Sequence, residues 1–250
     1  MSGHSKWASI KHKKAIVDSR RGQQFTKLAR AITVAARSGS GDPESNAALG
    51  NAVQKAKDAS MPKDNIERAI AKGTGAGADA DAIEEVLYEA YGPGGVALLI
   101  EALTDNRNRT GADVRHLLSK HGGNLGEPGS VSYLFNKRGI VIIDGARYGE
   151  DDLLAAIEAG AQDIVADGEA KIIEIACEPS DLAAVRAALE AAGIEFEAAQ
   201  VTQQPTVRVA VDEETAKKLL RLLDALEDND DVGEVHANFD VPADVLERIA

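Results

Sequence analysis

The residues in this chain with the clearest chemical potential are the cations at its beginning. Residues 1–30 contain eight of the chain's 28 basic residues but only one of its 41 acids, which leaves 20 bases against 40 acids in residues 31–250. Such a segment can bind a polyanion while the acidic remainder is repelled by it. We predict nucleic-acid contacts from Lys6, Trp7, Lys11, His12, Lys13, Lys14, Arg20, Arg21, Lys27 and Arg30. The alternative is a solvated tail, with the indole packed on neighbouring helices instead of stacked on a base.

A second polar segment, Asp105-Asn106-Arg107-Asn108-Arg109-Thr110, lies between a predicted strand and a predicted helix. Its Asn106, Arg107 and Arg109 could contact phosphates or base edges, and the N–H groups at the start of the helix could bind an anion. Asparagine and aspartate also favour turns and helix caps, and arginines pair with nearby acids. Both interpretations of this segment stay open.

No combination of residues indicates catalysis or a metal centre, so we predict a non-enzymatic protein without cofactors. The segment Gly73-Thr74-Gly75-Ala76-Gly77 lacks the Lys-Ser/Thr pair and the preceding strand of a phosphate-binding loop. The acidic turn at Asp228 and Asp230 has Val232 where a calcium ligand is needed. Cys177 lies in an apolar stretch, as a packing residue does.

Length and composition indicate a globular protein of two or three domains, since the chain has 250 residues and is 44% hydrophobic. Its single cysteine suits a reducing compartment. No apolar run approaches the roughly 18 residues of a membrane span, and the first residues do not resemble a secretory signal. We therefore expect a cytoplasmic protein with no membrane partner.

Helices must position the cations of the N-terminal region. Apolar residues recur at helical spacing through residues 19–72, which predicts a three-helix bundle after a flexible basic arm, residues 1–18. Asp42-Pro43 is expected to begin the second helix and Pro62 the third. The composition of residues 73–82, which is rich in glycine and alanine, indicates a linker.

Beyond the linker, strands and helices alternate. Gly92-Pro93-Gly94-Gly95 is predicted to join two strands by a tight reversal. A helix is expected to begin with Thr110 and Asp113 as a capping box, and residues 131–135 are expected to form a strand. Residues 136–204 follow the strand, helix, strand, strand, helix, strand order of a ferredoxin-like domain.

The segments on either side of this ferredoxin-like domain are each too small to fold alone. Residues 83–135 and 205–241 supply one helix each, and neither covers both of its exposed sheet edges. We expect the two segments to pair into one discontinuous α+β domain, with residues 136–204 inserted. The predicted fold class is therefore α+β, with an N-terminal three-helix domain and two ferredoxin-like α/β domains, the middle one discontinuous.

Several unusual motifs, spread nearly from end to end, together resemble the YebC/TACO family. They are Gly3-His4-Ser5-Lys6-Trp7, Ile10-Lys11-His12-Lys13-Lys14, Arg21-Gly22 with Phe25-Thr26-Lys27, Gly41-Asp42-Pro43, Tyr88-Glu89-Ala90-Tyr91-Gly92-Pro93-Gly94-Gly95, the polar segment at 105–110, and His121-Gly122-Gly123-Asn124-Leu125-Gly126. The resemblance implies a helical domain, two α/β domains and no enzymatic activity. Some members are described as transcriptional regulators or DNA binders. Others resemble translation factors that help the ribosome through stretches such as consecutive prolines.

Two functions therefore stay open, a ribosome-associated translation factor and a DNA-binding transcriptional regulator. A protein that reads a DNA groove normally presents a folded basic element. A flexible cationic arm is better suited to the phosphates of structured RNA. We favour ribosomal RNA, and hence the ribosome, as the partner. DNA is the alternative, and a protein partner on the acidic α/β domains is a further option.

Overall fold

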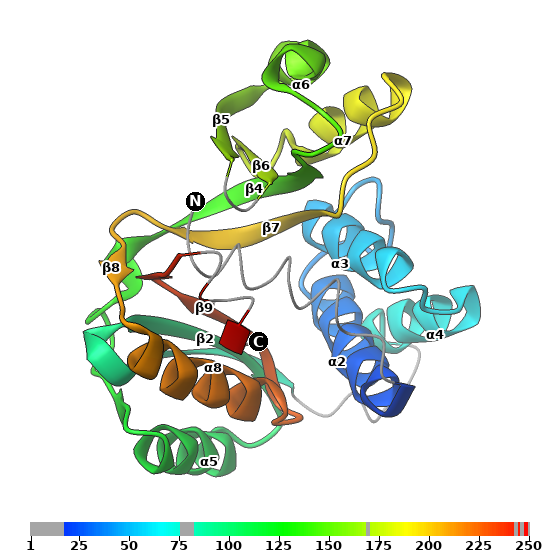
Figure 1. Cartoon of the computed structure of the whole chain (residues 1–250). Helices are drawn as coiled ribbons and strands as arrows, with labels where there is room; N and C mark the ends of the chain where they lie inside the picture. Colours follow the sequence, from blue (N-terminus) through cyan, green and yellow to red (C-terminus); the bar gives the residue numbers. More distant parts are fainter. Residues whose placement is uncertain (1–17, 76–82, 169–170, 243–244, 246–247, 250) are drawn as a thin grey trace.

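The computed structural model describes residues 18–75, 83–168, 171–242, 245 and 248–249, and side chains from residue 22 onward (Figure 1). The predicted arm, except for its last residue, and most of the predicted linker lie outside these residues. A helical bundle is followed by two α/β units with antiparallel sheets, so the predicted α+β fold class is confirmed.

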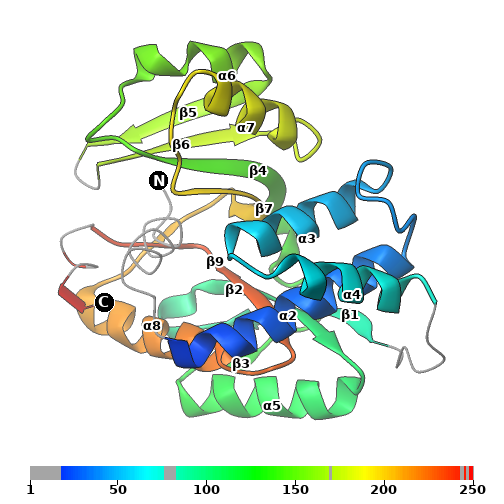
Figure 2. The same ribbon diagram turned by 90° about the vertical axis from the view of Figure 1, so that its right-hand side faces the viewer.

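The helical bundle consists of α2 (Asp18–Arg37), α3 (Ala47–Asp58) and α4 (Lys63–Gly73). Apolar side chains spaced along each helix form its core, among them Ile32, Leu49, Val53 and Ile66. Helices α2 and α4 lie side by side (Figure 2). At Gly73 they approach so closely that a Cβ atom would stand 2.4 Å from the carbonyl oxygen of Thr33, which is why a glycine is required there.

The second helix begins later than the sequence predicted. Asp42 and Pro43 form a turn instead, in which the Asp42 side chain accepts the N–H of Glu44 at 3.1 Å. Asn46 caps α3, because its Oδ1 accepts the N–H of Leu49 at 3.1 Å while its amide donates to the carbonyl of Ala35 at 2.9 Å. The cap therefore also ties α3 to α2, a contact that local spacing does not encode.

The first α/β unit joins segments that are far apart in the sequence. Its sheet has the order β3-β1-β2-β9, so a strand from the end of the chain pairs with β2. These strands are β1 (Glu84–Tyr91), β2 (Ala97–Thr104), β3 (Asn124–Leu125) and β9 (Val232–Ala237). One face is covered by α5 (Arg107–Lys120) and α8 (Glu213–Glu227), whose apolar side chains pack on Leu98 and Ile100. Two short strands, β8 (Val209–Ala210) and β10 (Phe239–Asp240), pair in parallel nearby.

The reversal between β1 and β2 is as predicted. A short 3-10 helix, η1 (Pro93–Gly95), connects the strands, and Tyr91 pairs with Ala97. Gly94 has a φ of +75°, and a Cβ atom there would stand 2.8 Å from the Thr215 side chain. Both the backbone conformation and the close approach of α8 favour glycine at this position.

The second α/β unit has the strand order β5-β6-β4-β7, which is the arrangement of the split βαβ motif. Its elements are β4 (Phe135–Asp144), η3 (Glu150–Leu153), α6 (Leu154–Glu158), β5 (Ala161–Asp167), β6 (Ile172–Cys177), α7 (Leu182–Ala191) and β7 (Ala198–Pro205). Ile143, Ile175 and Leu189 are among the fully buried side chains of its core.

The expected strand over residues 131–135 is wrong. Residues Ser132–Leu134 form the 3-10 helix η2, and β4 begins only at Phe135. The carboxylate of Glu89, on β1, accepts the N–H groups of Gly129 and Val131 at 2.6 Å and of Ser132 at 2.8 Å. Because these three N–H groups all donate to one side chain, the backbone forms a turn here instead of a β-strand.

Candidate nucleic-acid interface

The structure describes only part of the predicted nucleic-acid contacts. Lys6, Trp7, Lys11, His12, Lys13 and Lys14 lie outside the described residues. Arg20 and Arg21 belong to the first turn of α2, because this helix begins at Asp18, and their side chains are not described. The site can therefore be built from Lys27, Arg30, Asn106, Arg107 and Arg109.

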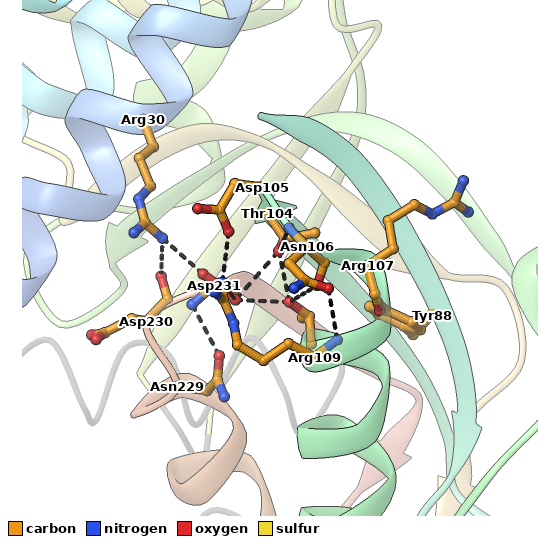
Figure 3. A network of polar contacts seen from close by, with 11 residues as sticks. Arg30, Tyr88, Thr104, Asp105, Asn106, Arg107, Arg109, Asn229, Asp230 and Asp231 are labelled. Atoms are coloured by element: carbon orange, nitrogen blue, oxygen red, sulfur yellow. Dashed lines mark hydrogen bonds and ion pairs between the residues drawn. The ribbon is translucent and has the colours of Figure 1, made fainter. Parts of the chain in front are cut away.

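Two of these candidates meet at one buried carboxylate (Figure 3). Asp231 lies directly before β9, and its side chain is 8% exposed. Nη1 of Arg30, from α2, is 3.0 Å from its Oδ1, and Nη2 of Arg109, from α5, is 2.7 Å from its Oδ2. The hydroxyl of Thr110 donates to the same Oδ2 at 2.7 Å. A cation of the helical bundle and a cation of the first α/β unit thus share one anion.

Asn106 has the capping role that was one of the two interpretations of this segment, whereas Thr110 does not have the role that the sequence predicted. Asn106 is the N-cap of α5, since its Oδ1 accepts the N–H of Arg109 at 3.1 Å. The helix therefore begins at Arg107, and the expected capping box at Thr110 and Asp113 is wrong. The reason is a tertiary contact. Thr110 is fully buried and its hydroxyl donates to Asp231, so this side chain is not available to cap the helix.

The two arginines of this segment differ in their availability to a ligand. Arg109 also bonds the Asp105 carboxylate at 2.8 Å, so its guanidinium is shared by two acids. Arg107 is 68% exposed, and its Nε is 3.8 Å from Glu84. Pairs with this much exposure contribute little to stability. Arg107 is therefore the better placed of the two to contact a phosphate.

Lys27 and Arg30 attach α2 to the acidic turn that follows α8. The ammonium of Lys27 donates to the carbonyl of Glu227, at the C-terminal end of α8, where a cation is favoured by the helix dipole. Arg30 also donates to the carbonyl of Asp230 at 3.0 Å. These contacts hold the helix that follows the basic arm against the first α/β unit.

The structure thus shows intramolecular partners for the predicted cations Lys27, Arg30 and Arg109, and a capping role for Asn106. Their contacts with nucleic acid stay predictions. Sequence reasoning missed two groups that organise the segment: Asp231, and Thr104, whose hydroxyl accepts the N–H of Asn106 at 2.8 Å. The available signal is the acidic turn around Asp230, which the sequence marks as acidic without indicating its partners. Its pairing with residues more than 100 positions earlier depends on the tertiary fold.

The surroundings of Asp231 favour its charged form. Burial by itself would raise the pKa of this carboxyl, but the hydrogen bonds from Arg109 and Thr110 and the arginine charges hold the pKa below 3.8. In the unfolded chain the group would take up its proton first as the pH falls. The stabilisation is therefore complete above about pH 4 and is lost as the pH falls through the pKa of the folded state.

We expect Asp231→Asn to lower the melting temperature at pH 7 by about 5 °C, because the arginines and Thr110 lose their charged acceptor. The difference from the unsubstituted protein should shrink as the pH falls below about 3.8, because the unfolded chain then takes up a proton that the native carboxyl, with its lowered pKa, does not yet bind. The matched control is Asp230→Asn, since that side chain is exposed. Thermal unfolding monitored by circular dichroism from pH 3 to pH 7 measures both effects. Equal shifts for the two variants would contradict this role of Asp231.

Other groups with catalytic potential are poorly suited to it. Burial raises the pKa of the Cys177 thiol to about 11, so the thiolate nucleophile is disfavoured at neutral pH. Within the described ranges, histidines, cysteines and carboxylates form no group of three that could hold a metal ion. None of the helices that the structure describes is long and apolar enough to cross a membrane.

Comparisons with known proteins cover nearly the whole chain. Residues 5–76 match the TACO1/YebC protein N-terminal domain, and residues 83–239 match the TACO1/YebC second and third domain. A probable transcriptional regulatory protein of Rubrobacter xylanophilus is 55% identical, and both chains are covered completely. A protein of the same description from Thermobifida fusca is 53% identical, again over all of both chains.

Among solved structures, a conserved hypothetical protein from Aquifex aeolicus superposes with a TM-score of 0.80 at 49% identity, over 93% of this chain and 96% of the other. The matched domains divide the chain where the helical bundle gives way to the α/β units. Sequence motifs, domain matches and architecture agree, and the chain belongs to the TACO1/YebC family.

Proposed function

We propose that this protein is a non-enzymatic, nucleic-acid-binding regulator of gene expression that acts in the cytoplasm on the ribosome. In this proposal it eases elongation at difficult stretches, such as consecutive prolines. The observation that carries the proposal is the charge distribution, with eight bases and one acid in residues 1–30 and 20 bases against 40 acids in the rest. A polyanion is attracted to the first part and repelled by the second.

The contacts of α2 support the idea that this charge distribution orients the protein on its nucleic-acid ligand. Lys27 and Arg30 fix α2 on the acidic turn between α8 and β9, so the arm continues from a helix that is held on the protein. A ligand attracted by the arm would meet the helical bundle first. The neighbouring acidic surfaces would keep RNA phosphates away from the α/β units, which leaves those units available to a protein partner.

The second candidate is a DNA-binding transcriptional regulator. It is favoured by relatives that are more than 50% identical and are described as probable transcriptional regulatory proteins. Against it stands the shape of the basic element. Duplex readers normally insert a helix or a ribbon into a groove, and here the helix following the arm has Lys27 and Arg30 engaged by the protein itself.

Ribosome profiling with matched RNA sequencing separates the two candidates. Cells with and without the protein are compared for ribosome density at each codon and for transcript abundance. Pausing that increases at particular codons, with unchanged transcript levels, supports the translation factor. Changed transcript levels with unchanged pausing support the transcriptional regulator and overturn the proposal.

A further inference from the structure

A groove of about 510 Å³ lies between the helical bundle and the first α/β unit, and no candidate residue except Arg30 had pointed to it. It is lined by α2 and α4 on one side and by residues of β2 and the following turn on the other. Figure 2 shows α2 and α4 side by side, near β1. The volume is within the usual range of ligand sites.

The groove has a cationic lining in a strongly acidic protein. Arg30, Arg68 and Lys72 line it, against the single acid Asp105 among the described lining residues. The carboxylate of Asp105 already bonds Arg109 at 2.8 Å, which offsets its charge. Arg30 is likewise paired with Asp231, so the net positive charge of the groove comes from Arg68 and Lys72, although residues 31–250 as a whole carry twice as many acids as bases.

The two outer cations are presented in a regular way. Arg68 and Lys72 are four residues apart on α4, so they lie one above the other on the same face of the helix. Both side chains are exposed, and Arg68 donates hydrogen bonds to the carbonyl of Asp64 and the side chain of Asn65 within its own helix. Neither cation is used to hold the domains together, unlike Arg30, and both are available to an anionic ligand.

The rest of the lining suits a nucleotide strand better than an isolated phosphate. The floor of the groove is apolar: Phe25 and Ala29 are partly buried there, above the buried core residues Met61 and Ala69. A base can lie over such a floor, while neighbouring cations neutralise the backbone phosphates. Thr26 and Asn65 add hydroxyl and amide groups that can bond sugar or base edges.

We propose that the groove between the helical bundle and the first α/β unit binds a single strand of RNA, with Arg68 and Lys72 on successive phosphates. This inference rests on the proposed function, since it assigns a second contact surface to the same ligand. The arm and the groove are connected through α2, which carries Arg20 and Arg21 in its first turn and Arg30 in the groove lining. A strand attracted by the arm can thus continue along the helix into the groove.

The test uses the full chain and a fluorescent oligouridylate, whose anisotropy is measured between 50 and 300 mM salt. Arg68→Gln with Lys72→Gln should lower the slope of log affinity against log salt by about 1.4, since two phosphate contacts of a single strand are lost. Across this sixfold range of salt the change corresponds to about twelvefold in relative affinity. Lys57→Gln with Lys63→Gln is the control, because both lysines are exposed, lie on the same bundle and are outside the groove lining.

A second measurement avoids any substitution. In the intact protein, bound oligouridylate should protect Lys72 from acetylation, as detected by mass spectrometry, while Lys63, whose side chain is 86% exposed, stays reactive. Equal losses of RNA affinity in the two double variants, or equal protection of Lys63 and Lys72 from acetylation, would overturn the proposal that the groove binds RNA. So would a groove variant that loses binding of polyglutamate but not of RNA, since the surface would then serve an acidic protein.

The outcome also distinguishes this inference from the proposed function. If Lys11→Gln, Lys13→Gln and Lys14→Gln together weaken RNA binding while the groove variant does not, the inference fails and the proposed function stands. If the unsubstituted protein does not bind the oligonucleotide or ribosomes at all, both fail.

Discussion

Replacing Lys11, Lys13 and Lys14 together with glutamine is expected to weaken ribosome binding by at least about tenfold near physiological salt, and to lower the salt slope by about 2. These lysines form the densest run of positive charge in the arm. Each contact with an RNA phosphate releases a counterion, and the loss of three contacts removes about 0.7 from the slope for each. Co-sedimentation with purified ribosomes at several salt concentrations measures both quantities.

The control for this experiment is a triple variant of the same charge change elsewhere, with glutamine at Lys57, Lys63 and Lys120. All three are exposed and lie outside the arm. If the control loses as much binding as the arm variant, net charge and not the arm determines the association. A salt slope near zero for the unsubstituted protein would instead indicate a protein partner, since no phosphates would then be neutralised.

The largest effect on stability is expected for Glu89→Gln, which should lower the free energy of unfolding by about 3 kcal/mol. The side chain is 8% exposed, and its two carboxylate oxygens accept three backbone N–H groups from Gly129, Val131 and Ser132. A glutamine amide has one oxygen, so its NH2 group would face at least one of these donors. A buried donor would then be left without an acceptor.

Urea unfolding of the Glu89→Gln variant measures this cost, and Glu85→Gln on the same strand is the control because its side chain is exposed. Burial alone would raise the pKa of Glu89, but the hydrogen bonds from Val131, Gly129 and Ser132 keep the pKa below 4.5. The stabilisation by Glu89 should therefore be complete at neutral pH and decline only in acid. If Glu89→Gln and Glu85→Gln have the same free energy of unfolding at pH 7, residues 129–132 keep their conformation without the carboxylate of Glu89.

Helix starts illustrate what sequence reasoning could and could not decide. Asn106 and Thr110 are both residue types that cap helices, and each is followed by polar residues at suitable spacing. The choice between them depends on Asp231, which accepts a hydrogen bond from the hydroxyl of Thr110 at 2.7 Å. Asn106 is therefore the residue that caps the helix. The same reasoning applies to Asn46, whose amide reaches the carbonyl of Ala35 on the preceding helix.

The predicted nucleic-acid-binding residues show the same distinction between what the sequence reveals and what the fold decides. The excess of cations in residues 1–30 is visible directly in the sequence, because charge is a property of residue type. Whether a given cation is available is a property of its neighbours. Arg30 and Arg109 converge on Asp231, whereas Arg107 is 68% exposed and Arg68 and Lys72 face the groove.

The sequence by itself determined the α+β class, the helical N-terminal region, the tight reversal at Gly92–Gly95 and the charge contrast between arm and body. These follow from periodicity, turn chemistry and composition, which act over a few residues. The sequence predicted that residues 83–135 and 205–241 pair, but only the tertiary structure decided that β9 is the strand beside β2, that Asp231 joins α2 to α5, and that α2 and α4 face the first α/β unit across a cationic groove. Each of these brings together residues far apart in the chain, where burial and hydrogen-bond satisfaction select the partners and local propensity does not.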